Sequence, residues 1–329
     1  MIPTYRAVFP ALCMALILPC AAPSMAEDAA KKTADAPAPA VQRQPLAERS
    51  VEDALALERQ LPAAEQQQLQ AGSDEFLALW RPANSGDPAG VVIIVPGAGE
   101  TPDWPQGVGP MRRKFPDVNW SSLSLSLPDL QSQAPQVRSA EAAPPAPTTS
   151  TSQPTPPDAA ASVEKGIAAE ADNAAASAEA PDPMTADAER IFARIEAAVA
   201  FAQQHKARSI VLIGQGSGAY WSARYLAERQ PPHVQKLVMV APKTPSNAPQ
   251  DIDALIPTIK IPTADVFYND RQPAKDAAQR RLQASKRQPG SQYHQVSLGV
   301  LPDRDAQQEQ LFRRVRGWVS PSDPSKPDA

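Results

Sequence analysis

The chain contains few of the residues that form covalent cross-links and metal sites. Its 329 residues include two cysteines, Cys13 and Cys20, and three histidines. It has no C-x-x-C pair, no H-E-x-x-H pattern and no G-x-x-x-x-G-K-[ST] phosphate loop. These absences argue against a zinc site and a P-loop nucleotide site, and we expect neither a metal nor a cofactor.

The chain also has no large excess of positive or negative charge. The formal net charge is −4 at pH 7 and the sequence pI is about 5.5. Such a chain is not expected to bind nucleic acid or an anionic membrane. Glycine is scarce, with 14 residues against 38 prolines, and this imbalance predicts long non-globular segments beside one folded domain.

The first 26 residues have the pattern of a secretory signal peptide. Arg6 supplies the positive charge, residues 7–18 form a short apolar run, and Ser24 and Ala26 are the small residues of a cleavage site. The run is too short for a stable membrane anchor. We therefore predict cleavage after Ala26 and a periplasmic mature chain that has no integral membrane segment. Both cysteines would leave with the signal, so the mature chain would contain no disulfide.

Three segments are too poor in large apolar residues to be expected to fold. Residues 27–45 are interpreted as a flexible leader and residues 321–329 as a polar tail. Residues 131–183 contain no Phe, Trp or Tyr and consist mostly of Pro, Ala, Ser, Thr and Gln. Such a segment cannot bury enough apolar area to offset its ordering entropy. We predict a disordered insertion at 131–183 within a domain that spans 46–320.

Strand and helix patterns alternate through the rest of the chain. Continuous β-branched runs such as residues 91–95 predict strands that are buried on both faces. Strands are expected at 74–80, 91–95, 120–127, 209–213, 236–241, 262–268 and 293–300, and helices on both sides of Pro62 and near 110–115, 185–199, 221–227, 272–286 and 305–319. This alternation predicts an α/β fold with a mostly parallel central sheet and helices on both faces.

The most informative stretch is SIVLIGQGSGAYWSARYLA (209–227), an apolar strand, a glycine-dense corner and a helix. A strand, a sharp turn and a helix form the nucleophile elbow G-x-S-x-G of α/β-hydrolases. Gly214 and Gly218 match the outer glycines, which places Gly216 at the nucleophile position and Ser217 one residue after it. Glycine readily adopts the positive φ of an elbow. We expect the shape of the elbow to be kept without its nucleophile.

With two further stretches the chain resembles the α/β-hydrolase superfamily, and more narrowly a family of secreted proteobacterial α/β-hydrolase-like proteins of unknown function. The matching stretches are VVIIVPGAGETPDW (91–104), SLSLPD (124–129) and LIGQGSGAYWSARYL (212–226). The resemblance implies a triad: a nucleophile at the elbow, an acid after a later strand and a histidine after the last strand. It implies no established reaction.

Two positions of this triad are empty. Asp270 follows the strand expected at 262–268 and fits the acid position, where an acid is also common turn chemistry. The loop after the last strand, residues 301–304, contains no histidine, so His294 inside that strand is the remaining candidate. Ser217 is the remaining candidate nucleophile, although the resemblance assigns its N–H to the oxyanion hole and its side chain to the start of a helix.

The oxyanion-loop position is occupied by Gly97, Ala98 and Gly99, whose backbone N–H groups are candidate donors to a carbonyl or carboxylate. A dinucleotide site is a competing interpretation, because residues 214–219 also match G-x-G-x-x-A after a strand. That fingerprint needs an acid about 20 residues later to hold the ribose. The next strand ends in VAPK (240–243), without an acid.

Three functional hypotheses follow. The first is a catalytically degenerate α/β-hydrolase-like protein that acts as a binding or scaffold protein, with a small molecule or an envelope protein as its partner, and we favour it because of Gly216 and the missing histidine. The second is a divergent, esterase-like serine hydrolase that uses Ser217. The third is an interaction protein that acts through residues 131–183. The sequence leaves the ligand, the oligomeric state and the physiological process open.

Overall fold

An eight-stranded sheet organises the protein, with the strand order β1-β2-β4-β3-β5-β6-β7-β8. The computed structural model describes residues 48–130 and 183–320. The strands are β1 (Gln66–Ala71), β2 (Asp74–Arg81), β3 (Gly90–Val95), β4 (Trp120–Leu125), β5 (Ile210–Gln215), β6 (Val234–Val240), β7 (Thr263–Tyr268) and β8 (Tyr293–Leu298). Strand β2 runs antiparallel to both of its neighbours, and the six strands from β4 to β8 are parallel. The predicted α/β fold with a mostly parallel sheet is confirmed.

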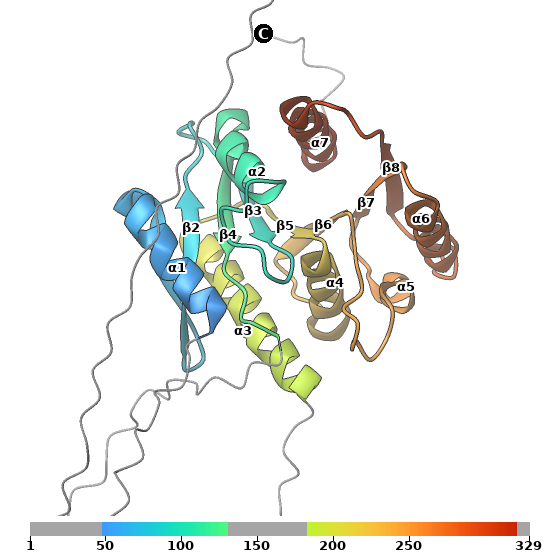
Figure 1. Cartoon of the computed structure of the whole chain (residues 1–329), viewed down its shortest axis with the longest axis horizontal. Helices are drawn as coiled ribbons and strands as arrows, with labels where there is room; N and C mark the ends of the chain where they lie inside the picture. The colour runs from blue at the N-terminus through green and yellow to red at the C-terminus, as the bar shows by residue number, and fades with distance from the viewer. Residues whose placement is uncertain (1–47, 131–182, 321–329) are drawn as a thin grey trace, which may run out of the picture. The chain divides into compact units, whose positions relative to one another are not determined.

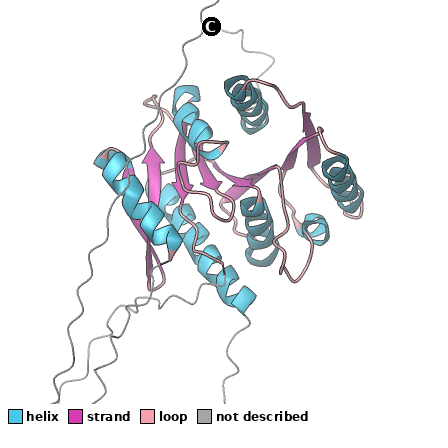
Figure 2. Cartoon of the chain, viewed as in Figure 1, coloured by secondary structure: helices cyan, strands magenta, loops and turns pink. Residues whose placement is uncertain are grey.

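Helices cover both faces of this sheet, as Figures 1 and 2 show. They are α1 (Arg49–Gln60), α2 (Val108–Lys114), α3 (Pro183–Gln204), α4 (Ser217–Arg229), α5 (Ile252–Leu255), α6 (Gln272–Ser285) and α7 (Arg304–Val319). Helices α3, α4 and α5 pack on one face of the sheet, and α2 and α7 pack on the other. Each face therefore has its own hydrophobic core.

The continuous apolar run of β3 explains how one strand serves both cores. Successive side chains of a strand point to opposite faces. Val91, Ile93 and Val95 accordingly lie in the core with α3 and α4. Val92 and Ile94 lie in the core with α2 and α7, and all five residues are buried. A run without polar alternation is what a central strand requires.

The prediction of a helix after Pro62 is wrong. The chain there forms a short 3-10 turn, Ala63–Glu65, and then the edge strand β1, whose sequence is QQQLQA. Strand β1 forms because it pairs antiparallel with the buried strand β2. The Gln66 amide also donates to the backbone oxygens of Glu58 and Leu61, both at 2.8 Å, and so joins the strand to the end of α1. Tertiary pairing overrides a polar local pattern here.

Helix α3 begins at Pro183, so this residue belongs to a helix and not to the predicted insertion. The other predictions for residues 1–26, 27–45, 131–182 and 321–329 lie outside the described residues. Within the described ranges, no helix combines the length and the apolar character needed to cross a membrane.

Candidate functional site

The corner between β5 and α4 is a sharp turn centred on Gly216. This residue has φ 56° and ψ −121°, a conformation that residues with a Cβ rarely adopt. Its N–H donates to the Val240 carbonyl at 2.9 Å, and its carbonyl accepts from the Lys243 N–H at 3.0 Å. The corner is therefore tied to β6 and to the loop that follows it.

The outer glycines of the corner are required by close packing. A Cβ on Gly214 would lie 2.4 Å from the Ala219 Cα, and a Cβ on Gly218 would lie 2.3 Å from the Pro96 carbonyl oxygen. At Gly216 the nearest atom to such a Cβ is the Gly97 Cα, at 3.9 Å. The central position thus has space for a side chain and carries none.

The oxyanion loop, residues 97–99, faces this corner, and two of its three N–H groups already have acceptors within the chain. The Gly97 N–H donates to Glu100 Oε2 at 2.7 Å, and the Ala98 N–H donates to Ser217 Oγ at 2.7 Å. An oxyanion hole works through N–H groups that await a developing negative charge. Here two chain oxygens, one of them from a carboxylate, take those N–H groups.

Gln215 holds Glu100 in this position. Its amide nitrogen donates to Glu100 Oε1 at 3.2 Å and to the Gln106 carbonyl at 2.8 Å. The carboxylate therefore receives hydrogen bonds on both oxygens. Glycine-rich turns after strands usually only reverse the chain, but this one carries an internal acceptor.

Ser217 is the first residue of α4, and its hydroxyl is turned to the oxyanion loop. A serine nucleophile needs a base within hydrogen-bond reach. In the described part of the chain, the only hydrogen bond of Ser217 Oγ is the one from Ala98. Among the described residues, no imidazole or carboxylate is hydrogen-bonded to this hydroxyl.

The structure does not bring the three catalytic candidates together. Asp270 lies two residues after β7, at the carboxyl ends of the strands, and pairs with Arg271 at 3.4 Å. His294 is the second residue of β8, exposed and opposite Ala264 in β7. It precedes the end of its strand by four residues, roughly 13 Å of extended chain. Ser217, at the elbow, contacts neither residue.

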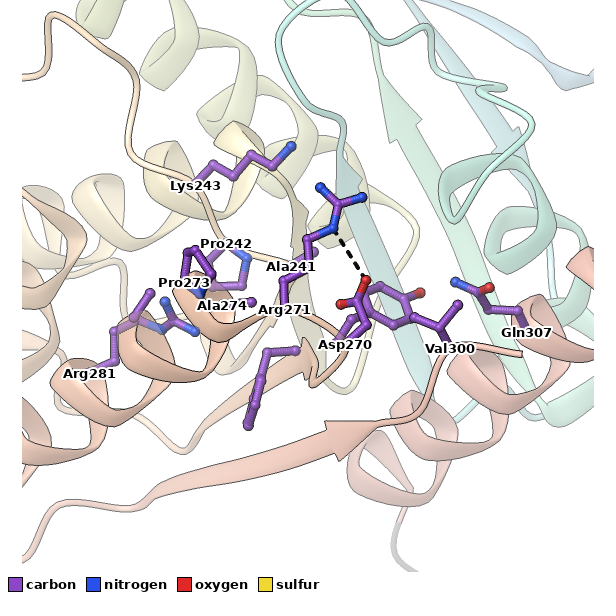
Figure 3. Close-up of a pocket in the computed structure, with 13 residues that line it drawn as sticks. Ala241, Pro242, Lys243, Asp270, Arg271, Pro273, Ala274, Arg281, Val300 and Gln307 are labelled. Atoms are coloured by element: carbon purple, nitrogen blue, oxygen red, sulfur yellow. Dashed lines mark ion pairs between the residues drawn. The ribbon is translucent and has the colours of Figure 1, made fainter. Parts of the chain in front are cut away.

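Two adjoining pockets lie at the carboxyl ends of the strands. The elbow pocket, of about 190 Å³, is lined by Glu100, Gln106, Gly107, Gln215, Gly216, Val240, Ala241, Lys243, Tyr268, Gln307, Gln308 and Leu311. The outer pocket, of about 620 Å³, is lined by Ala241, Pro242, Lys243, Phe267, Tyr268, Asp270, Arg271, Pro273, Ala274, Ala277, Arg281, Val300 and Gln307 (Figure 3). The four residues that line both are Ala241, Lys243, Tyr268 and Gln307, so the two spaces form one site.

A buried ion pair joins α6, whose Arg281 lines the outer pocket, to Asp265 of β7. Arg281 donates through Nε to Asp265 Oδ2 at 2.8 Å, and the two side chains are 3% and 0% exposed. The Tyr293 hydroxyl at 2.6 Å and the Gln295 amide at 2.9 Å also donate to Asp265 Oδ2. The sequence analysis missed this network, although an acid inside the apolar strand TADVFY was a signal that it needs buried partners.

The pKa values of this network follow from burial and charge. Burial, and after it the negative charge of Asp265, raises the pKa of Tyr293. For Arg281, burial lowers the pKa, but the Asp265 carboxylate outweighs burial and the net shift is upward. Both groups therefore stay protonated while the network is intact.

Lys243 is a further residue that the sequence analysis did not single out. Its side chain is exposed and lines both pockets, and within the described ranges no carboxylate lies within ion-pairing distance of it. It stands two residues after Ala241, which has φ 46°. The sequence signal for Lys243 as a site residue was its place just after a parallel strand, because ligands bind beyond the carboxyl ends of such strands. No group of three or more potential metal-ligating side chains occurs in the described residues.

Comparisons with known proteins agree with the fold described above. The crystal structure of a dienelactone hydrolase from Anabaena variabilis has a TM-score of 0.51 and 11% identity, covering 78% of this chain and 97% of that one. Est1E from Butyrivibrio proteoclasticus has a TM-score of 0.50 and 10% identity, with 78% and 97% covered. Identities this low show the fold alone, which is that of the α/β-hydrolases, as the resemblance predicted.

A comparison with curated proteins finds no significant match. The family described as "Protein of unknown function (DUF3530)" matches the chain over residues 9–321. The chain therefore belongs to the DUF3530 family, and its described part is an α/β-hydrolase fold with a glycine at the elbow.

Proposed function

We propose that this protein binds a small molecule at the elbow and outer pockets and has lost the covalent serine chemistry of its fold. One observation carries the proposal. The Gly97 and Ala98 N–H groups of the oxyanion loop are satisfied by the chain's own Glu100 and Ser217 oxygens, beside an elbow that carries no side chain. A site arranged in this way has no nucleophile at the elbow, and two of its candidate oxyanion donors are already engaged within the chain.

The position of Ser217 supports the loss of chemistry further. To act as a nucleophile, its hydroxyl would have to leave the Ala98 N–H. The vacated N–H would then serve the intermediate, but Ser217 would still have no base beside it. Catalysis by Ser217 would thus need two changes at once, the release of its hydroxyl from Ala98 and the approach of a base.

The binding half of the proposal rests on the pocket. A volume of about 620 Å³ lies within the range of small-molecule sites, roughly 300–1,000 Å³. Most of the lining is apolar, with a few polar side chains, and the site lies beyond the carboxyl ends of parallel strands. These features are typical of a ligand site and do not depend on a catalytic serine.

A neutral probe tests both halves. We expect 2-naphthamide to bind in a fluorescence titration, and 2-naphthyl acetate to be hydrolysed no faster than in buffer. Ala274→Trp places an indole in the outer pocket and should abolish binding, whereas Lys275→Trp, at an exposed position one residue along α6, should not. Turnover of the ester, or equal binding by both tryptophan variants, would contradict the proposal.

We also propose that the protein acts in the periplasm, on a small molecule or with an envelope protein. The support is the signal-peptide pattern of residues 1–26, which lie outside the described residues. Expression of the full chain followed by cell fractionation and mass measurement tests this. A periplasmic product that begins at Glu27 is expected, and a cytosolic product of full length would contradict it.

A further inference from the structure

The turn that carries Lys243 is fixed at both ends. The Ala241 N–H donates to the Val266 carbonyl at 2.8 Å, and the Lys243 N–H donates to the Gly216 carbonyl at 3.0 Å. Between them the backbone of Ala241 has a positive φ of 46°, although alanine carries a Cβ. Such strain persists only where the surroundings over-determine it, and it clusters at functional sites. These hydrogen bonds and the strained backbone therefore fix the position of Lys243 beside the elbow.

The charges around the site leave Lys243 without a counter-charge. Arg271 pairs with Asp270 at 3.4 Å, and Arg281 pairs with the buried Asp265 at 2.8 Å. Glu100, at the elbow end, is held by backbone and amide donors. In the part of the chain that the structure describes, the Lys243 ammonium is thus the one cation of this site that has no partner within 4.0 Å.

Apolar side chains also line the outer pocket, among them Phe267, Pro273, Ala277 and Val300, and Val300 is 50% exposed on the loop after β8. Figure 3 shows Lys243 and Val300 on opposite sides of the pocket, with Asp270 and Arg271 between them. A ligand that spans this site from Lys243 to Val300 meets a positive charge at one end and an apolar side chain at the other.

From this arrangement we propose that the ligand is an organic monocarboxylate with an apolar body, whose carboxylate lies at Lys243 and whose body lies against Phe267 and Val300. The inference rests on the proposed binding function and adds the ligand's chemical class. A single negative charge fits because Glu100 and Asp270 also line the site and would repel a ligand of higher charge. The carboxylate is bound as an ion, and no bond is formed or broken.

The test compares 2-naphthoate with 2-naphthamide, which has the same rings and no charge. Lys243 is exposed, so its contribution is that of a partly screened ion pair, and we expect the carboxylate to bind about fivefold more tightly at low salt. Lys243→Met should remove this preference, and Lys243→Arg should keep most of it. The matched control Lys275→Met, an exposed lysine on α6 that lines neither pocket, should leave it unchanged.

The outcomes separate the two proposals. Equal affinity of the wild-type chain for the acid and the amide would overturn the carboxylate inference and leave pocket binding intact. An equal loss in Lys243→Met and Lys275→Met would also overturn it, because the preference would then come from general surface charge. Failure of both probes to bind would overturn the binding function itself. Thermal unfolding of each variant checks that the fold is unchanged.

Discussion

The Ser217 hydroxyl lies 2.7 Å from the backbone nitrogen of Ala98 and accepts its hydrogen bond. This contact joins two segments 119 residues apart in the sequence, the start of α4 and the oxyanion loop. A serine that follows an elbow would be an obvious candidate nucleophile from sequence. Its observed partner is a backbone N–H, and we expect the contact to fasten the loop to the helix.

Ser217→Ala tests this fastening role. The substitution leaves the Ala98 N–H without its acceptor, and we expect a loss of about 0.5–1.5 kcal/mol in the free energy of unfolding. Urea unfolding at neutral pH measures it. Ser222→Ala is the matched control on the same helix, because Ser222 is buried and its hydroxyl has no partner in the described structure. An equal effect of the two changes would show that the Ala98 contact adds no stability.

The glycines of the corner should differ in their tolerance of a methyl group. Gly218→Ala drives a Cβ to 2.3 Å from the Val95 and Pro96 carbonyl oxygens, and we expect a loss of about 3 kcal/mol or more. Gly216→Ala has space but keeps a strained backbone with φ 56° and ψ −121°, which costs about 1–3 kcal/mol. Gly317→Ala, in α7 with no atom near the new methyl, should stabilise by about 0.5–1 kcal/mol. Denaturant midpoints rank the stability of the three variants. A larger loss of stability in Gly216→Ala than in Gly218→Ala would contradict this packing.

The buried pair Arg281–Asp265 predicts a large difference between neighbouring arginines. Arg281→Met leaves the fully buried Asp265 carboxylate without its cation and should cost about 3–5 kcal/mol. Arg280→Met removes an ion pair to Asp253 whose arginine is 63% exposed, so the expected change is below about 1 kcal/mol. Chemical unfolding measures the free energy of unfolding of the two variants. Equal stability of both would show that Asp265 is not held in a dry network.

The same network predicts a loss of stability at alkaline pH. Burial and Asp265 raise the pKa of Tyr293 above its unfolded value of about 10, so the folded state favours the protonated hydroxyl. Its contribution is fully present below about pH 10 and is lost as the pH rises toward the folded pKa. Burial raises the pKa of Tyr220 and Tyr225 in the same direction. Tyr293→Phe should therefore have lower stability at neutral pH and a shallower alkaline decline, and an unchanged decline would contradict the assignment.

The parts of the fold that local chemistry specifies could be predicted from the sequence. Two such patterns depend on neighbouring residues in the chain. The unbroken β-branched run of β3 predicts a central strand, and the spacing of Gly214, Gly216 and Gly218 predicts the sharp corner before α4. Strand β1 could not be predicted, because its Gln-rich sequence becomes a strand only through pairing with β2. Propensity is a weak guide wherever tertiary pairing decides.

The site was harder to predict than the fold for the same reason. Asp265 meets Gln295 because β7 and β8 pair in one particular register, and Arg281 reaches Asp265 from α6. The role of Lys243 depends on where two loops meet, and the occupied donors of the oxyanion loop depend on Glu100 turning back on Gly97. No spacing rule in one sequence encodes such contacts between distant segments.

Reaction with a fluorophosphonate probe tests the central claim, which is that the site has no activated serine. The mature wild-type chain and Ser217→Ala would be incubated with the probe beside an active serine esterase as the positive control. The account predicts that the esterase is labelled and that neither form of this protein is. Labelling of the wild-type chain that disappears in Ser217→Ala would contradict it and would assign the serine a catalytic role.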